Sequence, residues 1–103
     1  MDIAVKAARK AFDEGPWRRT PPEERRRLLL KFADILEKNA NEVAALETLD
    51  NGKPYTDAKE DIKFCLETIR YYAGWTEKIS GSTIPISGPY FCYTREEPVG
   101  VCG

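Results

Sequence analysis

Apolar residues recur every three or four positions between residues 1 and 81, a spacing that places side chains on one face of an α-helix. The first stripe consists of Val5, Ala8 and Phe12. We expect Asp2 to cap this helix and Gly15-Pro16 to end it. Trp17 follows in the linker, where burial at the edge of a core is the favoured role for a large aromatic side chain.

A longer helical pattern comes next, and the sequence marks both its start and a break inside it. Thr20 and Glu23 flank a proline pair and have the spacing of a capping box. Five apolar residues continue the stripe: Leu29, Phe32, Leu36, Val43 and Leu46. Asn39 stands where this stripe requires an apolar residue, and Asn41 can cap a new helix. We therefore expect two helices with a break at residues 39–41.

The stretch 46–55 predicts a corner between two helices. Asn51-Gly52 tolerates the positive φ of a helix C-terminus, and Pro54 suits a helix start because it has no amide donor. The next helix is expected to have Thr56 or Asp57 as its cap and Gly81 as its stop.

This last helix has apolar residues on more than one face. Its main stripe is Ala58, Ile62, Cys65, Ile69 and Tyr72. Outside the stripe lie Phe64, Leu66, Tyr71 and Trp75. Such a helix is buried on several sides or binds a partner.

After residue 81 the pattern favours β-structure. Residues 83–86 and 90–94 are rich in β-branched and aromatic side chains and are separated by Ser87-Gly88-Pro89. Residues 99–103 form a third, short apolar run. We expect three to four helices followed by two or three short strands. A strand pair with open edges is marginal in water, which indicates a piece of a larger fold.

Composition and charge narrow the function classes. The 103 residues are 42% hydrophobic and 32% charged, with a net charge of −1, which gives no overall attraction to nucleic acid or an anionic membrane. No apolar run reaches the ~18 residues of a membrane span, and the N-terminal residues do not resemble a signal peptide. The basic residues cluster at Arg18, Arg19 and the run 25–27. Consecutive helical residues point about 100° apart, so the run spreads around its helix and does not form one stripe. This favours a solvated, salt-bridged face over a phosphate-binding patch.

Candidate catalytic chemistry is sparse. The sequence has no histidine, so neither a Ser-His nor a Cys-His nucleophile can be assembled, and it has no glycine-rich cofactor motif. Cys65, Cys92 and Cys102 are odd in number and widely spaced, which fits reduced thiols in the cytoplasm or the mitochondrial matrix. Inert burial in a core is the favoured role for each of them.

Four blocks of the sequence carry a family resemblance: residues 11–19, 46–55, 70–75 and 97–103, with sequences such as LETLDNGKPY and RYYAGW. Together they resemble the N-terminal region of NAD(P)-dependent aldehyde dehydrogenases of the tetrameric, non-acylating class. The resemblance implies an α/β family fold, of which this chain is an incomplete, mostly helical piece. It further implies a helical segment flanking the nucleotide-binding domain at residues 1–81, a strand segment of the oligomerisation domain at 82–97, and the start of the first strand of the cofactor domain at 98–103.

The same resemblance implies oxidation of an aldehyde to a carboxylic acid through a cysteine thiohemiacetal, with NAD or NADP as cofactor. The family's nucleophile, general base and oxyanion asparagine have no counterpart in this chain, so no catalytic, cofactor-binding or metal residue is assigned, and no cofactor is expected for the chain alone. Phe64 falls at or near a position that lines the family's aldehyde channel. The implied partners are the remainder of an aldehyde dehydrogenase or a homologous subunit, in an oligomer.

A second interpretation stays open beside the enzyme segment. The chain could be a short interaction module without catalytic activity that binds a partner through its helices and an open strand edge. The aldehyde substrate, the choice between NAD and NADP, and the compartment depend on residues outside these blocks.

Overall fold

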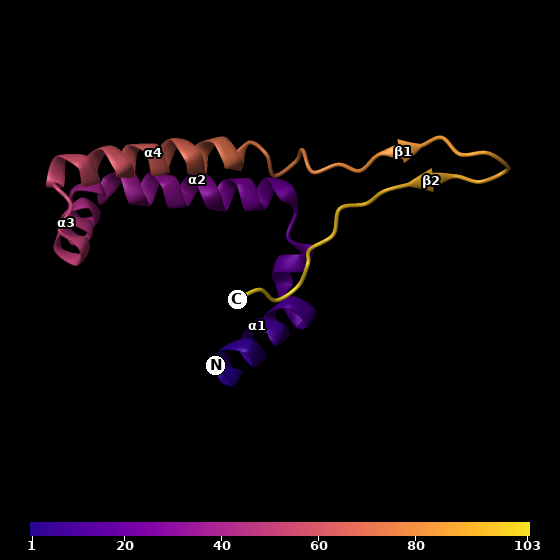
Figure 1. Ribbon diagram of the computed structural model, residues 1–103, viewed down its shortest axis with the longest axis horizontal. Helices are drawn as coiled ribbons and strands as arrows, with labels where there is room; N and C mark the ends of the chain where they lie inside the picture. Colours follow the sequence, from indigo (N-terminus) through magenta and orange to yellow (C-terminus); the bar gives the residue numbers. More distant parts are fainter. The chain divides into compact units, whose positions relative to one another are not determined.

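The computed structural model describes residues 1–103 and contains helices followed by one strand pair (Figure 1). In chain order the elements are α1 (Asp2–Glu14), the 3₁₀-helix η1 (Pro16–Arg19), α2 (Pro22–Lys38), α3 (Ala40–Asn51), α4 (Tyr55–Ala73), β1 (Thr83–Ile84) and β2 (Cys92–Tyr93). They form two compact units. One unit is Pro22–Glu77, and the other combines Met1–Pro21 with Lys78–Gly103. The predicted count of three to four helices and two or three strands is confirmed.

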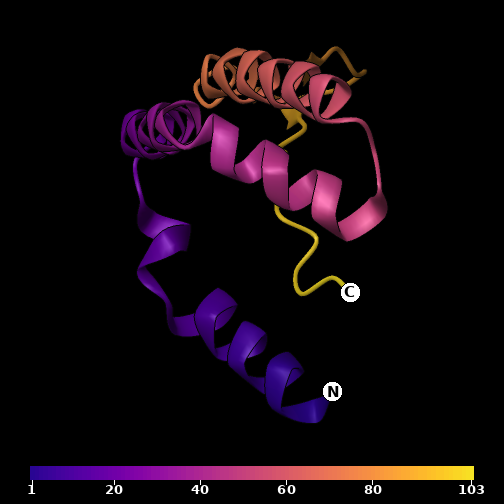
Figure 2. The ribbon, with the colours of Figure 1, turned by 90° about the vertical axis from the view of Figure 1, so that its left-hand side faces the viewer.

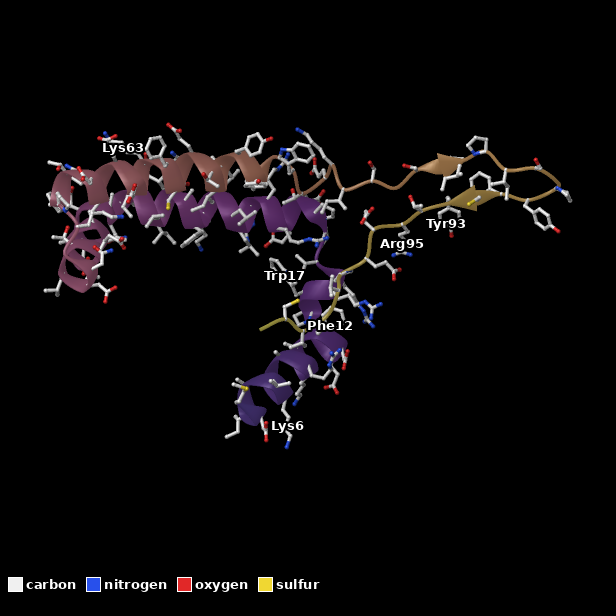
Figure 3. The ribbon with its side chains drawn as sticks, viewed as in Figure 1. Lys6, Phe12, Trp17, Lys63, Tyr93 and Arg95 are labelled. Atoms are coloured by element: carbon white, nitrogen blue, oxygen red, sulfur yellow. The ribbon has the colours of Figure 1, made fainter.

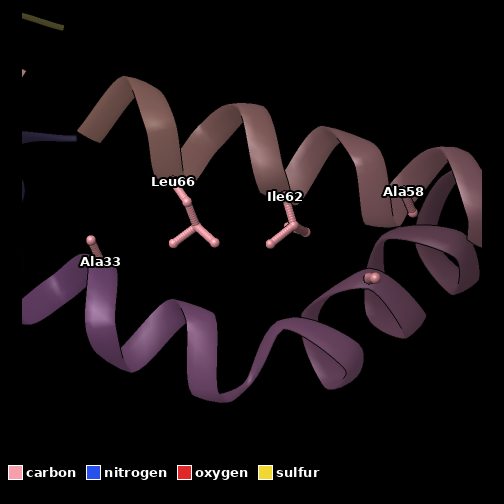
Figure 4. Packing of buried hydrophobic residues seen from close by; sticks show 5 residues of the cluster. Ala33, Ala58, Ile62 and Leu66 are labelled. Atoms are coloured by element: carbon pink, nitrogen blue, oxygen red, sulfur yellow. The ribbon is translucent and has the colours of Figure 1, made fainter. Parts of the chain in front are cut away.

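In the helical unit, α2 and α4 lie side by side and α3 packs against α4 at one end (Figures 1 and 2). The buried cluster between them is small and consists of Ala33, Ala44, Ala58, Ile62 and Leu66. Ile62 and Leu66 project from α4 toward α2, where Ala33 faces them (Figure 4). Three alanines of this cluster are fully buried, so small side chains fill much of the contact beside the two larger residues of α4.

The predicted break between the second and third helices is confirmed, but its cap is a different residue. Asn39, not Asn41, precedes α3. The Asn39 side-chain amide donates to the Ile35 carbonyl at 2.7 Å, and its own carbonyl accepts from the Val43 amide at 3.0 Å. Asn39 therefore satisfies the last turn of α2 with its side chain and starts α3 with its backbone.

The corner between α3 and α4 follows the turn chemistry of the sequence. Gly52 has φ of +80° and donates its amide to the Thr48 carbonyl at 2.9 Å, as in a left-handed helix C-cap. The Asn51 side chain accepts the Lys53 amide at 2.8 Å. Pro54 precedes the first residue of α4, so the predicted caps Thr56 and Asp57 are wrong.

The predicted stripe of α4 is wrong at three positions. Cys65 and Tyr72 are exposed, whereas Leu66 is buried with 7% of its surface accessible. The buried positions step through Ala58, Ile62, Leu66 and Ala73, with Ile69 packed beside the core. The helix also ends earlier than expected, because Gly74 caps it through bonds to the carbonyls of the preceding turn.

Two caps in the N-terminal part of the chain also differ from expectation. Met1 stands at the N-cap position of α1, so Asp2 lies inside its first turn, and Gly15 ends the helix as predicted. The Thr20 hydroxyl donates to the Pro16 carbonyl at 3.2 Å, and α2 begins at Pro22, so Thr20 does not form the predicted capping box. Trp17 in η1 keeps 56% of its surface exposed, so the predicted core-edge role is wrong in this chain (Figure 3).

The strands β1 and β2 are antiparallel, with Thr83 opposite Tyr93 and Ile84 opposite Cys92. Bonds between Ser82 and Thr94 extend the ladder: the Thr94 amide donates to the Ser82 carbonyl, and the Ser82 amide donates to the Thr94 hydroxyl, each at 2.8 Å. Gly81 lies so close to Thr94 that a Cβ would overlap its carbonyl. Gly81 is thus required by strand pairing and not by a helix stop. Residues 94–103 contain no regular strand, so the third apolar run does not pair here.

Candidate functional site

The one residue that the sequence assigns to a substrate site, Phe64, lies on the outer face of α4. It is two residues from both Ile62 and Leu66, about 200° around the helix from each of these core residues. Phe64 accordingly keeps 63% of its surface exposed. The adjacent Lys63 lies on the side of α4 away from α2, where Figure 3 labels it. A ligand or another segment can therefore reach the Phe64 ring.

Three further aromatic residues extend this exposed surface to the end of α4 and two residues beyond it. The Tyr71 ring packs edge-on against Tyr72 with centroids 5.1 Å apart, and it lies 6.2 Å from the Trp75 ring at a tilted angle. These three residues keep between 44% and 60% of their surfaces exposed. We call Phe64, Tyr71, Tyr72 and Trp75 the aromatic face. Aromatic side chains of this kind supply much of the energy of buried interfaces, so the face is suited to being covered by another surface.

Ion pairs connect α4, which carries most of the aromatic face, to its two neighbours. Arg70 of α4 donates to Glu37 of α2 at 2.6 Å and to Asp34 of α2 at 3.4 Å. At the other end, Lys53 lies between two carboxylates, one on α3 (Glu47, 3.2 Å) and one on α4 (Asp61). The sequence did not predict the ion pairs of Arg70 and Lys53, because their carboxylate partners lie on other elements of the chain.

The same contacts shift pKa values. The hydrogen bond from Arg70 lowers the pKa of Glu37 below its ordinary value, and the Glu37 carboxylate raises the pKa of Arg70. Hydrogen bonds to Asp61 and then Glu47 raise the pKa of Lys53. These shifts all favour the charged forms. They describe structural ion pairs and not groups prepared for proton transfer near neutral pH.

Two arginines of the run on α2, Arg26 and Arg27, are exposed and salt-bridged, as predicted, whereas Arg25 is half-buried and its Nε has no hydrogen-bond partner. Arg27 makes two bonds to Glu24, at 2.7 and 2.5 Å, and Arg26 lies 3.6 Å from Glu77. The hydrogen bond with Arg27 lowers the pKa of Glu24, and the same bond raises the pKa of Arg27. Carboxylates therefore compete directly with any phosphate for these guanidinium groups.

The cysteines occupy places that the sequence did not predict. Cys65 and Cys102 are exposed and Cys92 is half-buried, so the expected burial in a core is wrong. Lys63, the basic residue nearest Cys65 in sequence, is paired with Glu60. No His, Cys, Asp and Glu side chains gather in a group able to hold a metal ion.

Comparison with known proteins identifies the family to which this architecture belongs. The model of the aldehyde dehydrogenase family matches residues 1–103. The chain is 59% identical over 104 residues to DhaS of Bacillus subtilis (strain 168), a provisionally named aldehyde dehydrogenase, and 56% identical over 105 residues to human mitochondrial aldehyde dehydrogenase. The chain belongs to the aldehyde dehydrogenase family.

Solved structures agree with this assignment. An NAD-dependent aldehyde dehydrogenase from Sinorhizobium meliloti is 44% identical with a TM-score of 0.75, over 79% of this chain and 16% of that one. A betaine aldehyde dehydrogenase from Staphylococcus aureus, solved with NAD⁺, is 32% identical with a TM-score of 0.79, over 85% of this chain and 18% of that one. The helices and the strand pair are therefore an incomplete piece of the aldehyde dehydrogenase fold.

The matched relatives are much longer than this chain. All of the chain aligns, but it spans only 21% of the Bacillus relative and 20% of the human one. None of its helices combines the length and apolar character that a bilayer crossing requires.

Proposed function

We propose that this chain is the N-terminal segment of an NAD-dependent aldehyde dehydrogenase, an enzyme that oxidises an aldehyde to a carboxylic acid through a cysteine thiohemiacetal. The match of the family model to residues 1–103 is the observation that carries the proposal. The sequence has no histidine and no counterpart of the family's nucleophile, general base or oxyanion asparagine, so in this proposal the segment is not catalytically competent alone. Its physical role is to pack against the catalytic machinery and to support assembly.

Each part of the chain has a place in this proposal. Residues 1–81 flank the nucleotide-binding domain, residues 82–97 belong to the oligomerisation domain, and residues 98–103 begin the first strand of the cofactor domain. The strand pair supports the second assignment, because β1 and β2 have only two residues each and open edges that a larger sheet could complete. Residues 95–103 form no regular strand in this chain alone, and in the proposal the rest of the enzyme supplies the neighbours of the strand that begins at residue 98.

Phe64 is proposed to line the aldehyde channel of the complete enzyme. Its ring is exposed on the face of α4 opposite the core, where it is available to a substrate. Arg70 connects the helix that carries it to α2, and Lys53 bridges that helix to α3. An apolar ring at this place would select aldehydes by shape and apolar contact and would take no part in bond making.

Cofactor, partners and compartment follow from the proposal. NAD or NADP would bind in the complete enzyme and not to this chain alone. The partners are the rest of the dehydrogenase and homologous subunits of an oligomer, with no nucleic acid or membrane involved. The proposed compartment is the cytoplasm, with the mitochondrial matrix as the alternative, since mitochondrial enzymes are among the relatives.

The deciding experiment is the intact mass of the native polypeptide that carries this sequence, isolated without overexpression. The chain itself has a mass of 11.7 kDa. A mass about five times larger, matching the share of the relatives that the chain spans, supports the proposal. NAD reduction by that polypeptide with an added aldehyde would complete the test.

A second function is favoured by the aromatic face and the open strand edges. If the native mass is 11.7 kDa, the chain is an interaction module without catalytic activity that covers these surfaces with a partner or a longer relative. Mass therefore separates the two proposals, because only the first requires a longer polypeptide.

A further inference from the structure

We draw no further inference here: the strongest candidate, the aromatic face that Phe64, Tyr71, Tyr72 and Trp75 leave exposed along α4, carries nothing because nothing in the structure shows what covers it.

Discussion

The Arg70 guanidinium on α4 donates a hydrogen bond to the Glu37 carboxylate on α2 at 2.6 Å, across 33 residues of sequence. This pair joins the two longest helices of the chain on an exposed surface. Its Coulomb attraction is screened by water, so we expect a modest effect on stability that weakens with added salt.

The first prediction concerns the pH dependence of this pair. The folded-state pKa of Glu37 is lowered from its ordinary value of 4.5 by Arg70. The pair therefore stabilises the fold at pH values above about 4.5, and this contribution is lost as pH falls through the lower, folded-state pKa. Glu37→Gln should lower the thermal midpoint slightly at neutral pH, and the difference from wild type should vanish in acid.

Circular dichroism melts at neutral and acidic pH check this prediction. Glu67→Gln is the matched control, because Glu67 is an exposed glutamate of α4 outside the ion pairs. A Glu37→Gln deficit that persisted unchanged at low pH would show that the carboxylate charge is not the cause.

A second prediction tests the alanine-based packing of the helical unit. Ala44 has no accessible surface, whereas its neighbour Ala45 in α3 is exposed. Ala44→Leu adds volume where two helices meet and should destabilise the fold by about 1–3 kcal/mol. Ala45→Leu makes the same chemical change on the outer side and should have little effect. Denaturant unfolding of both variants measures the difference, and equal losses would argue against close packing at Ala44.

The positive φ of Gly52 gives a third prediction. A Cβ at this position would contact nothing within 4 Å, so the cost of a side chain comes from the backbone conformation, φ of +80°. Gly52→Ala should destabilise the chain by roughly 1–2 kcal/mol. Gly52→Asn should cost less, because asparagine tolerates the left-handed region. Thermal melts of the two variants rank them, and the opposite order would contradict the backbone explanation.

Sequence periodicity predicted the helices well but did not fix which side each helix buries. Phe32 and Leu46 of the second predicted stripe keep 54% and 57% of their surfaces exposed, and α1 buries none of its residues.

The sequence also left the buried side of α4 open. From Ile62 onward, the set with Cys65 and the set with Leu66 both have helical spacing. The structure buries the second set because Leu66 faces Ala33 and the rest of the small cluster. That choice depends on the shape of a distant helix, which a local pattern does not contain.

Caps and long-range ion pairs were missed for related reasons. Asn39 and Asn41 are equally good capping residues by type, and only the backbone path selects Asn39. The partners of Arg70 lie 33 and 36 residues away, beyond any helical spacing.

The corner at Gly52 was predictable because its turn chemistry is local. The position of Phe64 outside the core stripe was also visible in the sequence, but its contact with substrate stays a prediction.

A fourth prediction follows from the contact between Gly81 and Thr94. Any Cβ on Gly81 would overlap the Thr94 carbonyl, so Gly81→Ala should break the bonds between Ser82 and Thr94 and loosen the strand pair. Gly103→Ala is a suitable control, since a Cβ there meets no neighbour. Cross-strand nuclear Overhauser effects between Thr83 and Tyr93 report the pairing directly. Their survival in Gly81→Ala would show that the backbone can shift without losing register.

The last prediction tests the proposed channel role of Phe64 in the complete polypeptide. Phe64→Ala removes an exposed aromatic ring without touching the helix core, so folding and cofactor binding should be preserved. Apolar contact with the substrate would be lost, and kcat/KM for an aromatic aldehyde should fall about tenfold, with acetaldehyde less affected. The KM for NAD should not change.

Phe32→Ala is the matched control for this experiment. Phe32 lies on α2 and keeps 54% of its surface exposed, close to the value for Phe64, so the same truncation is made on a different helix. Steady-state kinetics with aldehydes of increasing size should separate the two variants. If both variants lose activity equally for every aldehyde, the Phe64 effect reflects general packing. A size-dependent loss confined to Phe64→Ala would instead support contact between this ring and the substrate, since general packing has no reason to depend on the length of the aldehyde.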